Sequence, residues 1–192
     1  MLAFLRALPI ALISVGLLVT PTAAARKHAP AAHKLTEDSV NNAEWRRGKP
    51  SAAMLVRLQI LLDRAHAYPG QIDANLGENT RKAIAALQEI RGLDDGQEPD
   101  ERMLRALVEN DREPALVKYT ITDKDVAGPF IERVPKDFRE KARLKHLSYT
   151  GPKELLAEKF HMSENLLQRL NPGVSLDQAG APIGMPWSSP GT

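Results

Sequence analysis

The sequence predicts a protein that is mainly α with a small α+β part. Apolar residues recur at helical spacing in three segments between residues 51 and 113, which indicates three amphipathic helices. After residue 114, a short segment that mixes β-branched and aromatic residues and a second short segment near the C-terminus flank two further helical segments, and both short segments are interpreted as strands. The chain of 192 residues contains no Cys, so we expect its stability to come from apolar cores and not from disulfides.

Residues 1–25 have the pattern of a secretory signal peptide. Arg6 precedes an apolar run, Leu8–Val19, and a short tract of alanines follows it. The run is shorter than the roughly 20 residues of a membrane span, and small residues suit cleavage by signal peptidase near Ala24 or Ala25. We therefore expect a periplasmic or cell-wall-associated protein without membrane contact after cleavage. An uncleaved signal anchor is the alternative.

Residues 26–50 are rich in Ala, Pro, His and charged residues and show no apolar periodicity. This composition is typical of a solvated chain, so we predict a flexible linker before the first folded domain. An attraction of its basic start, at Arg26 and Lys27, to anionic wall polymers is the alternative interpretation.

Residues 51–113 predict a three-helix domain. Ser51 and Asp100 suit the N-caps of the first and third helices, and the second helix is expected to begin at Glu78 or Asn79. Tyr68-Pro69-Gly70 breaks the first helix, and Gly92-Leu93 suits a left-handed cap with an apolar contact after the second. The predicted buried faces comprise Leu55, Leu58, Leu61, Leu62, Ala65, Ala83, Ile84, Leu87, Ile90, Met103, Leu104, Leu107 and Val108.

Residues 114–187 predict a second domain in the order strand, helix, helix, strand. The expected strands are Leu116–Ile121 and Ile183–Pro186. One helix follows Gly151-Pro152, and the next is capped by Ser163 and ended by Asn171-Pro172-Gly173.

Residues 123–148 interrupt this second domain and are interpreted as a basic insertion, while residues 188–192 are interpreted as a tail. The segment Lys136–His146 is strongly charged. If it docks an acidic partner, the protein would be a periplasmic protein–protein adaptor, which is one alternative for its function.

Charge and ligand patterns argue against several function classes. The formal net charge is +2 without a one-sided basic stripe, so we expect no nucleic-acid partner. The five His residues lack metal-ligand spacing, so we expect no metal and no cofactor; His66 and His161 are interpreted as structural residues near helix C-termini. Asp94 and Asp95 lie in a predicted turn, which argues against a pair of acids for glycoside cleavage.

Glycines, polar residues and apolar residues recur at ordered spacing in the first domain. They read Leu58-Gln59-x-x-Leu62, Gly70-x-Ile72-Asp73-x-x-x-Gly77-x-x-Thr80-x-x-Ala83-Ile84-x-x-Leu87-Gln88 and Gly92-Leu93-x-x-Asp95-Gly96. The domain thereby resembles the three-helix peptidoglycan-binding domain of many wall hydrolases and transpeptidases. We expect Asp73 and Thr80 to satisfy free amides near the start of the second helix. That family usually has an aromatic residue where Leu76 stands, which implies looser sugar stacking here.

The second domain carries Tyr149-Thr150-x-x-x-Glu154-Leu155-Leu156-Ala157-Glu158-Lys159-Phe160, Ser163-x-x-x-Leu167-x-x-Leu170-Asn171-Pro172 and Ala179-Gly180-x-x-Ile183-x-Met185-Pro186. These residues resemble a lysin-motif (LysM) domain, a βααβ module that binds N-acetylglucosamine-containing glycans. Gly151-Pro152-Lys153 stands where that family usually has Gly-Asp-Thr. The resemblance implies a three-helix peptidoglycan-binding domain followed by a LysM-like βααβ module.

The two domains in this order after a signal peptide resemble the N-terminal half of exported L,D-transpeptidases. The catalytic domain of those enzymes uses a Cys nucleophile, and this chain stops at Thr192 without any Cys. We therefore expect that the protein is not an enzyme and binds peptidoglycan (murein) without catalysing a reaction. The enzyme-class alternative is a truncated L,D-transpeptidase whose catalytic domain is encoded separately.

The expected partners are peptidoglycan glycan strands or stem peptides, bound by a monomer. In the first domain, hydrogen bonds from polar side chains would reach sugar hydroxyls or stem-peptide carboxylates, and an aromatic ring would form an apolar wall. In the second domain, the two helices would return the chain to one edge and bring its binding residues together. The candidate binding residues are Tyr68, Asn75, Leu76, Asn79, Thr80, Arg81, Tyr149, Thr150 and Asn171.

Overall fold

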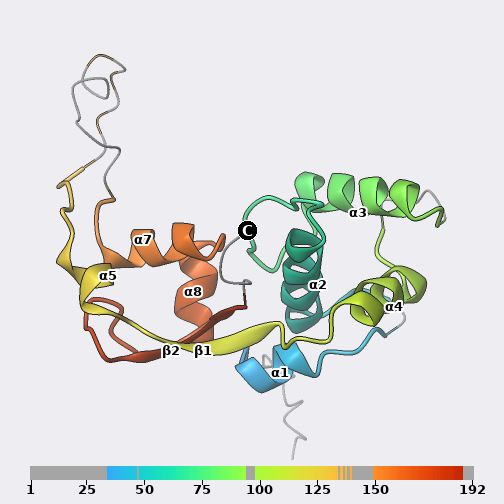
Figure 1. Cartoon of the computed structure of the whole chain (residues 1–192), viewed down its shortest axis with the longest axis horizontal. Coiled ribbons are helices and arrows are strands. Elements are labelled where there is room, and N and C mark those ends of the chain that lie inside the picture. The colour runs from blue at the N-terminus through green and yellow to red at the C-terminus, as the bar shows by residue number, and fades with distance from the viewer. Residues whose placement is uncertain are drawn as a thin grey trace, which may run out of the picture. The chain divides into compact units, whose positions relative to one another are not determined.

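Three helices form from the amphipathic segments between residues 51 and 113 (Figure 1). In the computed structural model, α2 spans Ala52–Arg64, α3 spans Glu78–Ile90 and α4 spans Glu101–Asn110. The structure describes residues 34–46, 48–93, 98–133, 135, 137, 139 and 149–187.

Several predicted features lie outside the described residues. They are the signal peptide, the first part of the linker (26–33), the Asp94–Asp95 turn, most of the segment Lys136–His146, and the tail. Within the part of the chain that the structure describes, none of the helices combines the length and apolar character needed to cross a membrane.

The ends of these helices form as the sequence predicts. Ser51 caps α2 and Asp100 caps α4, because each side chain accepts a hydrogen bond from a backbone amide in the first turn. Gly92 follows α3 in the left-handed conformation, with φ of 61°, and the Leu93 amide donates to the Gln88 carbonyl at 2.8 Å. These contacts satisfy polar groups that helix ends otherwise leave unpaired.

One apolar core lies among α2, α3 and α4. The prediction that Ile90 belongs to it is wrong, since this side chain is 81% exposed. Gln88 takes the corresponding buried place, because positions 80, 83, 84, 87 and 88 follow one helical face and position 90 falls off it. The buried residues of this core are Ala43, Met54, Leu58, Leu61, Leu62, Ala83, Ile84, Leu87, Met103, Leu104 and Leu107.

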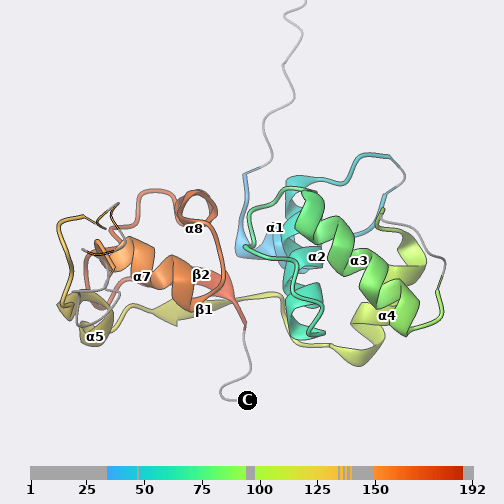
Figure 2. The same cartoon turned by 90° about the horizontal axis from the view of Figure 1, so that it is seen from above.

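The two predicted strands form a two-stranded antiparallel sheet (Figure 2). β1 spans Leu116–Thr120 and β2 spans Pro182–Pro186, with Leu116 opposite Pro186. Between the strands the chain forms α5 (Asp123–Ala127), α7 (Pro152–Lys159) and α8 (Glu164–Leu170). The coarse class, mainly α with a small α+β part, is thus what the described residues adopt.

A second core lies between this sheet and the neighbouring helices, and α2 contributes to it as well. Val56 and Ile60 of α2 pack into the second core, whereas Leu58 and Leu62 pack into the first. Residues from Lys34 onward belong to one compact unit. The predicted boundary near residue 114 therefore does not separate two independent cores. Because α2 is apolar on nearly all sides, it has to be buried by other elements on two opposite faces, and each face belongs to one of the two cores.

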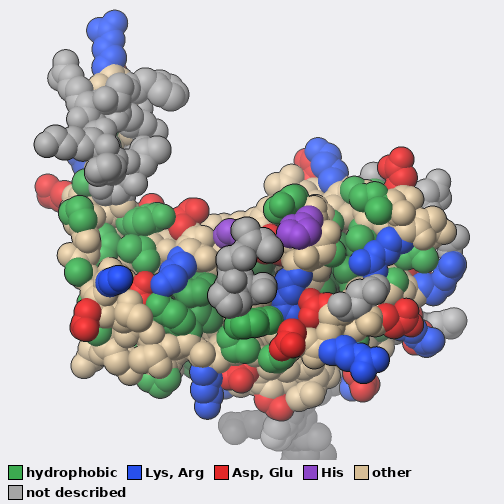
Figure 3. Space-filling view, viewed as in Figure 1, with side chains coloured by type: hydrophobic (Ala, Val, Ile, Leu, Met, Phe, Trp, Pro, Cys, Tyr) green, Lys and Arg blue, Asp and Glu red, His purple; other side chains and the backbone are tan. Residues whose placement is uncertain are grey.

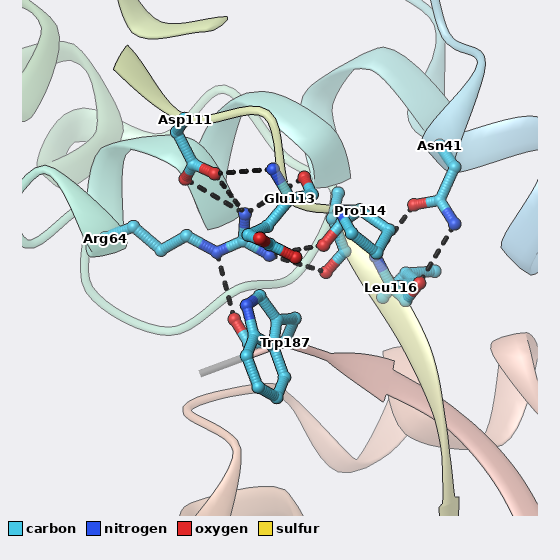
Figure 4. Close-up of polar contacts among 8 residues, drawn as sticks. Asn41, Arg64, Asp111, Glu113, Pro114, Leu116 and Trp187 are labelled. Carbon is cyan, nitrogen blue, oxygen red and sulfur yellow. Dashed lines mark hydrogen bonds and ion pairs between the residues drawn. The ribbon is translucent and has the colours of Figure 1, made fainter. Parts of the chain in front are cut away.

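Residues 34–46 form ordered structure in place of the predicted flexible linker. α1 spans Glu37–Asn41 and begins with a capping box between Thr36 and Ser39. Val40 is fully buried, and the Asn41 side chain exchanges two hydrogen bonds with the Leu116 backbone, at 2.9 and 2.8 Å (Figure 4). These contacts fix α1 against α2 and β1.

The start of the predicted basic insertion is instead a capped helix, α5, that is joined to the second core. Its buried Asp125 accepts hydrogen bonds from the Tyr119 hydroxyl at 2.6 Å and from the Lys159 ammonium at 2.8 Å. Burial raises the pKa of Asp125, but these bonds and those from Thr122 outweigh it and hold the pKa well below the ordinary value. Through Asp125, α5 is therefore hydrogen-bonded both to β1 and to α7.

Candidate functional site

Three of the predicted binding residues line one cleft of about 720 Å³. Asn75 and Leu76 come from the loop before α3, and Arg81 comes from the first turns of α3. Lys49, which precedes α2, and Arg169 of α8 line the same cleft. We refer to it as the basic cleft.

The loop that carries Asn75 is held in shape by Gln59, a buried polar side chain of α2. Its Nε2 donates to Asp73 Oδ1 at 2.9 Å, to the Asn75 carbonyl at 3.1 Å and to Thr80 Oγ1 at 3.2 Å. Its Oε1 accepts from the Asp73 amide at 3.2 Å and the Ala74 amide at 3.0 Å. One side chain thus satisfies the backbone of a turn that has no secondary-structure partner of its own.

Asp73 stabilises the same turn from within. Its carboxylate accepts a hydrogen bond from the Asn75 backbone amide at 2.8 Å, as in an Asx turn. Burial raises the pKa of Asp73, but hydrogen bonds from Gln59 and Asn75 outweigh this effect and lower it. Asp73 therefore satisfies a free backbone amide shortly before α3, as expected. The same expectation is wrong for Thr80, whose hydroxyl bonds to Gln59 and to the Asn75 carbonyl, and the N-cap residue of α3, Gly77, supplies no side-chain cap.

The charges in the basic cleft favour an anionic ligand. Arg81 forms an ion pair with Glu98 at 2.9 Å and also donates to the Leu76 carbonyl. Lys49 and Arg169 form no ion pair within the described residues, so two cations remain to attract a carboxylate. Guanidinium and ammonium groups give the strongest hydrogen bonds to such an anion.

The remaining predicted residues of the first domain lie elsewhere or point inward. Thr80 is buried with its hydroxyl bonded to Gln59, so we treat it as structural. Asn79 is exposed, and its side chain packs over Gly70, where an added Cβ would lie 3.1 Å from Asn79 Nδ2. Tyr68 is 67% exposed and lines a different hollow.

The predicted residues of the second domain are tied to different elements. Asn171 is buried: its side chain donates to the Gly184 carbonyl at 3.1 Å and accepts from the Gly184 amide at 2.6 Å, which fixes the end of α8 to β2. The Thr150 amide and hydroxyl both donate to Glu154 of α7 at 2.6 Å. No hydrogen bond of the described residues joins Asn171 to Thr150, so the expectation that they form one site has no support from these contacts, and Asn171 has a structural role.

Glu154 and Tyr149 stabilise the segment that precedes α7. The hydrogen bonds from the hydroxyl and amide of Thr150 lower the pKa of Glu154. The Tyr149 carbonyl accepts from the Ile131 amide at 2.9 Å, and the Tyr149 side chain is half-buried. Thr150 remains exposed, but its hydroxyl hydrogen is already donated within the fold.

The two described histidines lie just after helices, as predicted. His66 follows α2, and His161 follows α7, where its Nδ1 lies 3.2 Å from the Asp63 carboxylate. Among the described ranges, no group of three or more His, Cys, Asp or Glu side chains is arranged to hold a metal ion.

Three residues important to the site were not among the binding residues predicted from the sequence. A signal for Gln59 was present, because it is a polar residue on the otherwise apolar face of α2. Lys49 and Arg169 gave no signal, since charged residues in a loop and on a helix surface are ordinary. Only the folded chain brings these two residues, far apart in the sequence, to one cleft.

A comparison with models of known protein families finds no match, and a comparison with curated proteins finds no significantly similar sequence.

Proposed function

We propose that this chain is an exported, wall-associated protein that binds peptidoglycan without catalysing a reaction. The observation that carries the proposal is the basic cleft, where Arg81, Arg169 and Lys49 line the same hollow as Asn75. The Asn75 side chain is exposed; its Nδ2 donates to the Asp73 carboxylate at 3.0 Å, which leaves its Oδ1 to accept hydrogen bonds. Peptidoglycan offers both chemistries that such a cleft accepts, namely stem-peptide carboxylates and sugar hydroxyls.

Each cleft residue has a defined role in this proposal. Arg169 and Lys49 bind a stem-peptide carboxylate, and Oδ1 of the Asn75 side chain accepts a hydrogen bond from a hydroxyl or peptide N–H group. Leu76 provides a small apolar contact. Arg81 is held by Glu98 and positions the loop through the Leu76 carbonyl. An open site of this kind is expected to bind with a dissociation constant on the order of 10 μM to 1 mM, or about −4 to −7 kcal/mol.

Sedimentation of the protein with purified insoluble peptidoglycan tests the proposal. We expect the protein in the pellet at low salt, and release as the salt concentration rises, because exposed charge pairs are screened. Recovery of all the protein in the supernatant at low salt would overturn the proposal.

Charge reversal locates the binding surface. Arg169→Glu is expected to reduce the affinity for the wall about tenfold or more. Arg105→Glu is the matched control, because Arg105 is an exposed arginine of α4 outside the basic cleft and the change in net charge is the same. Equal losses in the two variants would show that net charge, and not the basic cleft, governs binding.

A further inference from the structure

A second hollow, of about 640 Å³, lies where α2 ends and α7 ends. Tyr68, Phe160 and Trp187 supply aromatic rings to its lining, and Asp63, His66 and His161 supply polar groups. We call it the aromatic cleft. Figure 3 shows exposed His side chains on the corresponding face of the molecule.

The backbone of the aromatic cleft is unusual. His66, Tyr68 and His161 all have positive φ, of 57°, 46° and 53°, and all three line this cleft. Side chains with a Cβ adopt this conformation at an energetic cost, and residues strained in this way cluster at functional sites. Tyr68 gains little burial in return, since its side chain is mostly exposed and contacts His66 with the rings 6.0 Å apart.

Hydrogen bonds and an ion pair fix the residues that line the aromatic cleft. Arg64 forms an ion pair with Asp111 at 2.9 Å and donates to the Trp187 carbonyl at 2.9 Å (Figure 4). The Ile72 amide donates to the His161 carbonyl at 2.8 Å, which joins the loop before α3 to the turn after α7. A cleft with fixed walls binds a ligand at a smaller entropic cost.

The charges of the aromatic cleft favour a neutral ligand. The Lys and Arg side chains of its lining already face carboxylates: Arg64 pairs with Asp111, and Lys159 pairs with Asp125. Among the described residues of this lining, no Lys or Arg is therefore left unpaired to attract an anion, in contrast to the basic cleft. The groups that remain are aromatic faces, hydrogen-bonding atoms and the Glu113 carboxylate, which would repel an anion.

We propose that the aromatic cleft is a binding site for a neutral sugar ring. Tyr68 and Trp187 offer flat apolar faces to the C–H side of such a ring, while Asp63 and the imidazoles exchange hydrogen bonds with its hydroxyl groups. The volume of the cleft lies within the range of small-ligand sites. This inference goes beyond the proposed function, because it places a sugar site apart from the basic cleft and needs none of its residues.

Trp187 gives a direct readout of this site. The chain contains two tryptophans, Trp45 and Trp187, so a Trp45→Phe background leaves Trp187 as the sole indole. Titration of this full-length variant with the neutral tetramer of N-acetylglucosamine is expected to change Trp187 fluorescence saturably, with a midpoint on the order of 1 mM or below. The absence of a saturable change up to about ten times that concentration would overturn the inference.

Substitutions of Tyr68 test the aromatic contact. Tyr68→Ala is expected to weaken tetramer binding about tenfold, and Tyr68→Phe to retain it within a few-fold. Ile90→Ala is the control, because Ile90 is another large, exposed apolar residue and lies outside the cleft. Circular dichroism verifies folding, and His161→Ala provides a second variant, with weakened binding expected, should Tyr68→Ala fail to fold. Unchanged binding in Tyr68→Ala, or in His161→Ala in its place, would refute the site.

The same variants distinguish this inference from the proposed function. A protein that stays in the supernatant with insoluble wall but shows a Tyr68-dependent tetramer response refutes wall binding and supports the aromatic cleft. A protein that sediments through Arg169 but shows no tetramer response supports the basic cleft and refutes the sugar site.

Discussion

Gln59 and Gln88 are both buried glutamines, but their hydrogen bonding differs, and this difference makes a sharp prediction. Gln59 is 1% exposed and makes five hydrogen bonds to the turn before α3 and to Thr80. Gln88 is 2% exposed, and its Oε1 has no hydrogen-bond partner within the described residues. Replacement of each by Leu, which has a similar volume, separates the value of the hydrogen bonds from that of packing.

The expected magnitudes follow from the groups left behind. Gln59→Leu leaves the backbone amides of Asp73 and Ala74 without their partner and removes one of the two donors to the Asn75 carbonyl. A buried unpaired group costs about 1–3 kcal/mol, while the apolar Leu returns about 1 kcal/mol. Since Asp73 and Asn75 lie near solvent and can rehydrate, we expect a net loss of about 2–3 kcal/mol. Gln88→Leu removes an unpaired oxygen, so we expect it to be neutral or stabilising by up to about 1 kcal/mol.

Urea unfolding followed by circular dichroism measures both free energies of unfolding. Gln59→Leu is expected to lower the midpoint concentration with little change in slope. It is also expected to weaken wall binding, because the loop carrying Asn75 loses its support. If the two variants have equal stabilities, or if Gln88→Leu is the less stable one, the reasoning about buried hydrogen bonds in this protein is refuted.

Two further substitutions test the ionic contacts of the fold. Arg64→Lys is expected to lower the free energy of unfolding, measured in urea, by about 2 kcal/mol, because an ammonium cannot reach both Asp111 and the Trp187 carbonyl as the planar guanidinium does. A loss below about 0.5 kcal/mol would contradict this expectation. Asp125 has a folded-state pKa below its reference value of 3.8, so its contribution is present above that pH and is lost as the pH falls through the folded pKa. The stability gap between the protein and Asp125→Asn is therefore expected to narrow below about pH 4 in a pH series of urea unfolding, and a gap independent of pH would contradict the role of this carboxylate.

Local signals in the sequence predicted the helix ends well. Ser51, Asp100 and Ser163 cap helices as expected, because a cap depends on a few neighbouring residues. The left-handed turn at Gly92 was predictable for the same reason. The strands were also recognisable, although their antiparallel register follows only from the structure.

Features that depend on distant contacts were missed. α1 has only five residues, too few to show an apolar period, and its burial comes from contacts with α2 and β1. The basic cleft was half predicted: the loop before α3 supplied Asn75 and Leu76, but Arg169 joins them from almost a hundred positions away. A charged residue on a helix surface looks the same in the sequence whether it faces a cleft or bulk water.

The shared helix α2 has a practical consequence for any attempt to divide the protein. A cut between Glu113 and Pro114 would expose Val56 and Ile60 of α2 to solvent in the N-terminal fragment. In the C-terminal fragment, the core beside the sheet would lose the side chains that α2 contributes. Each fragment would expose a hydrophobic patch and would tend to self-associate. Expression of separate halves is thus a poor route to studying them, and the intact chain should melt in a single cooperative step.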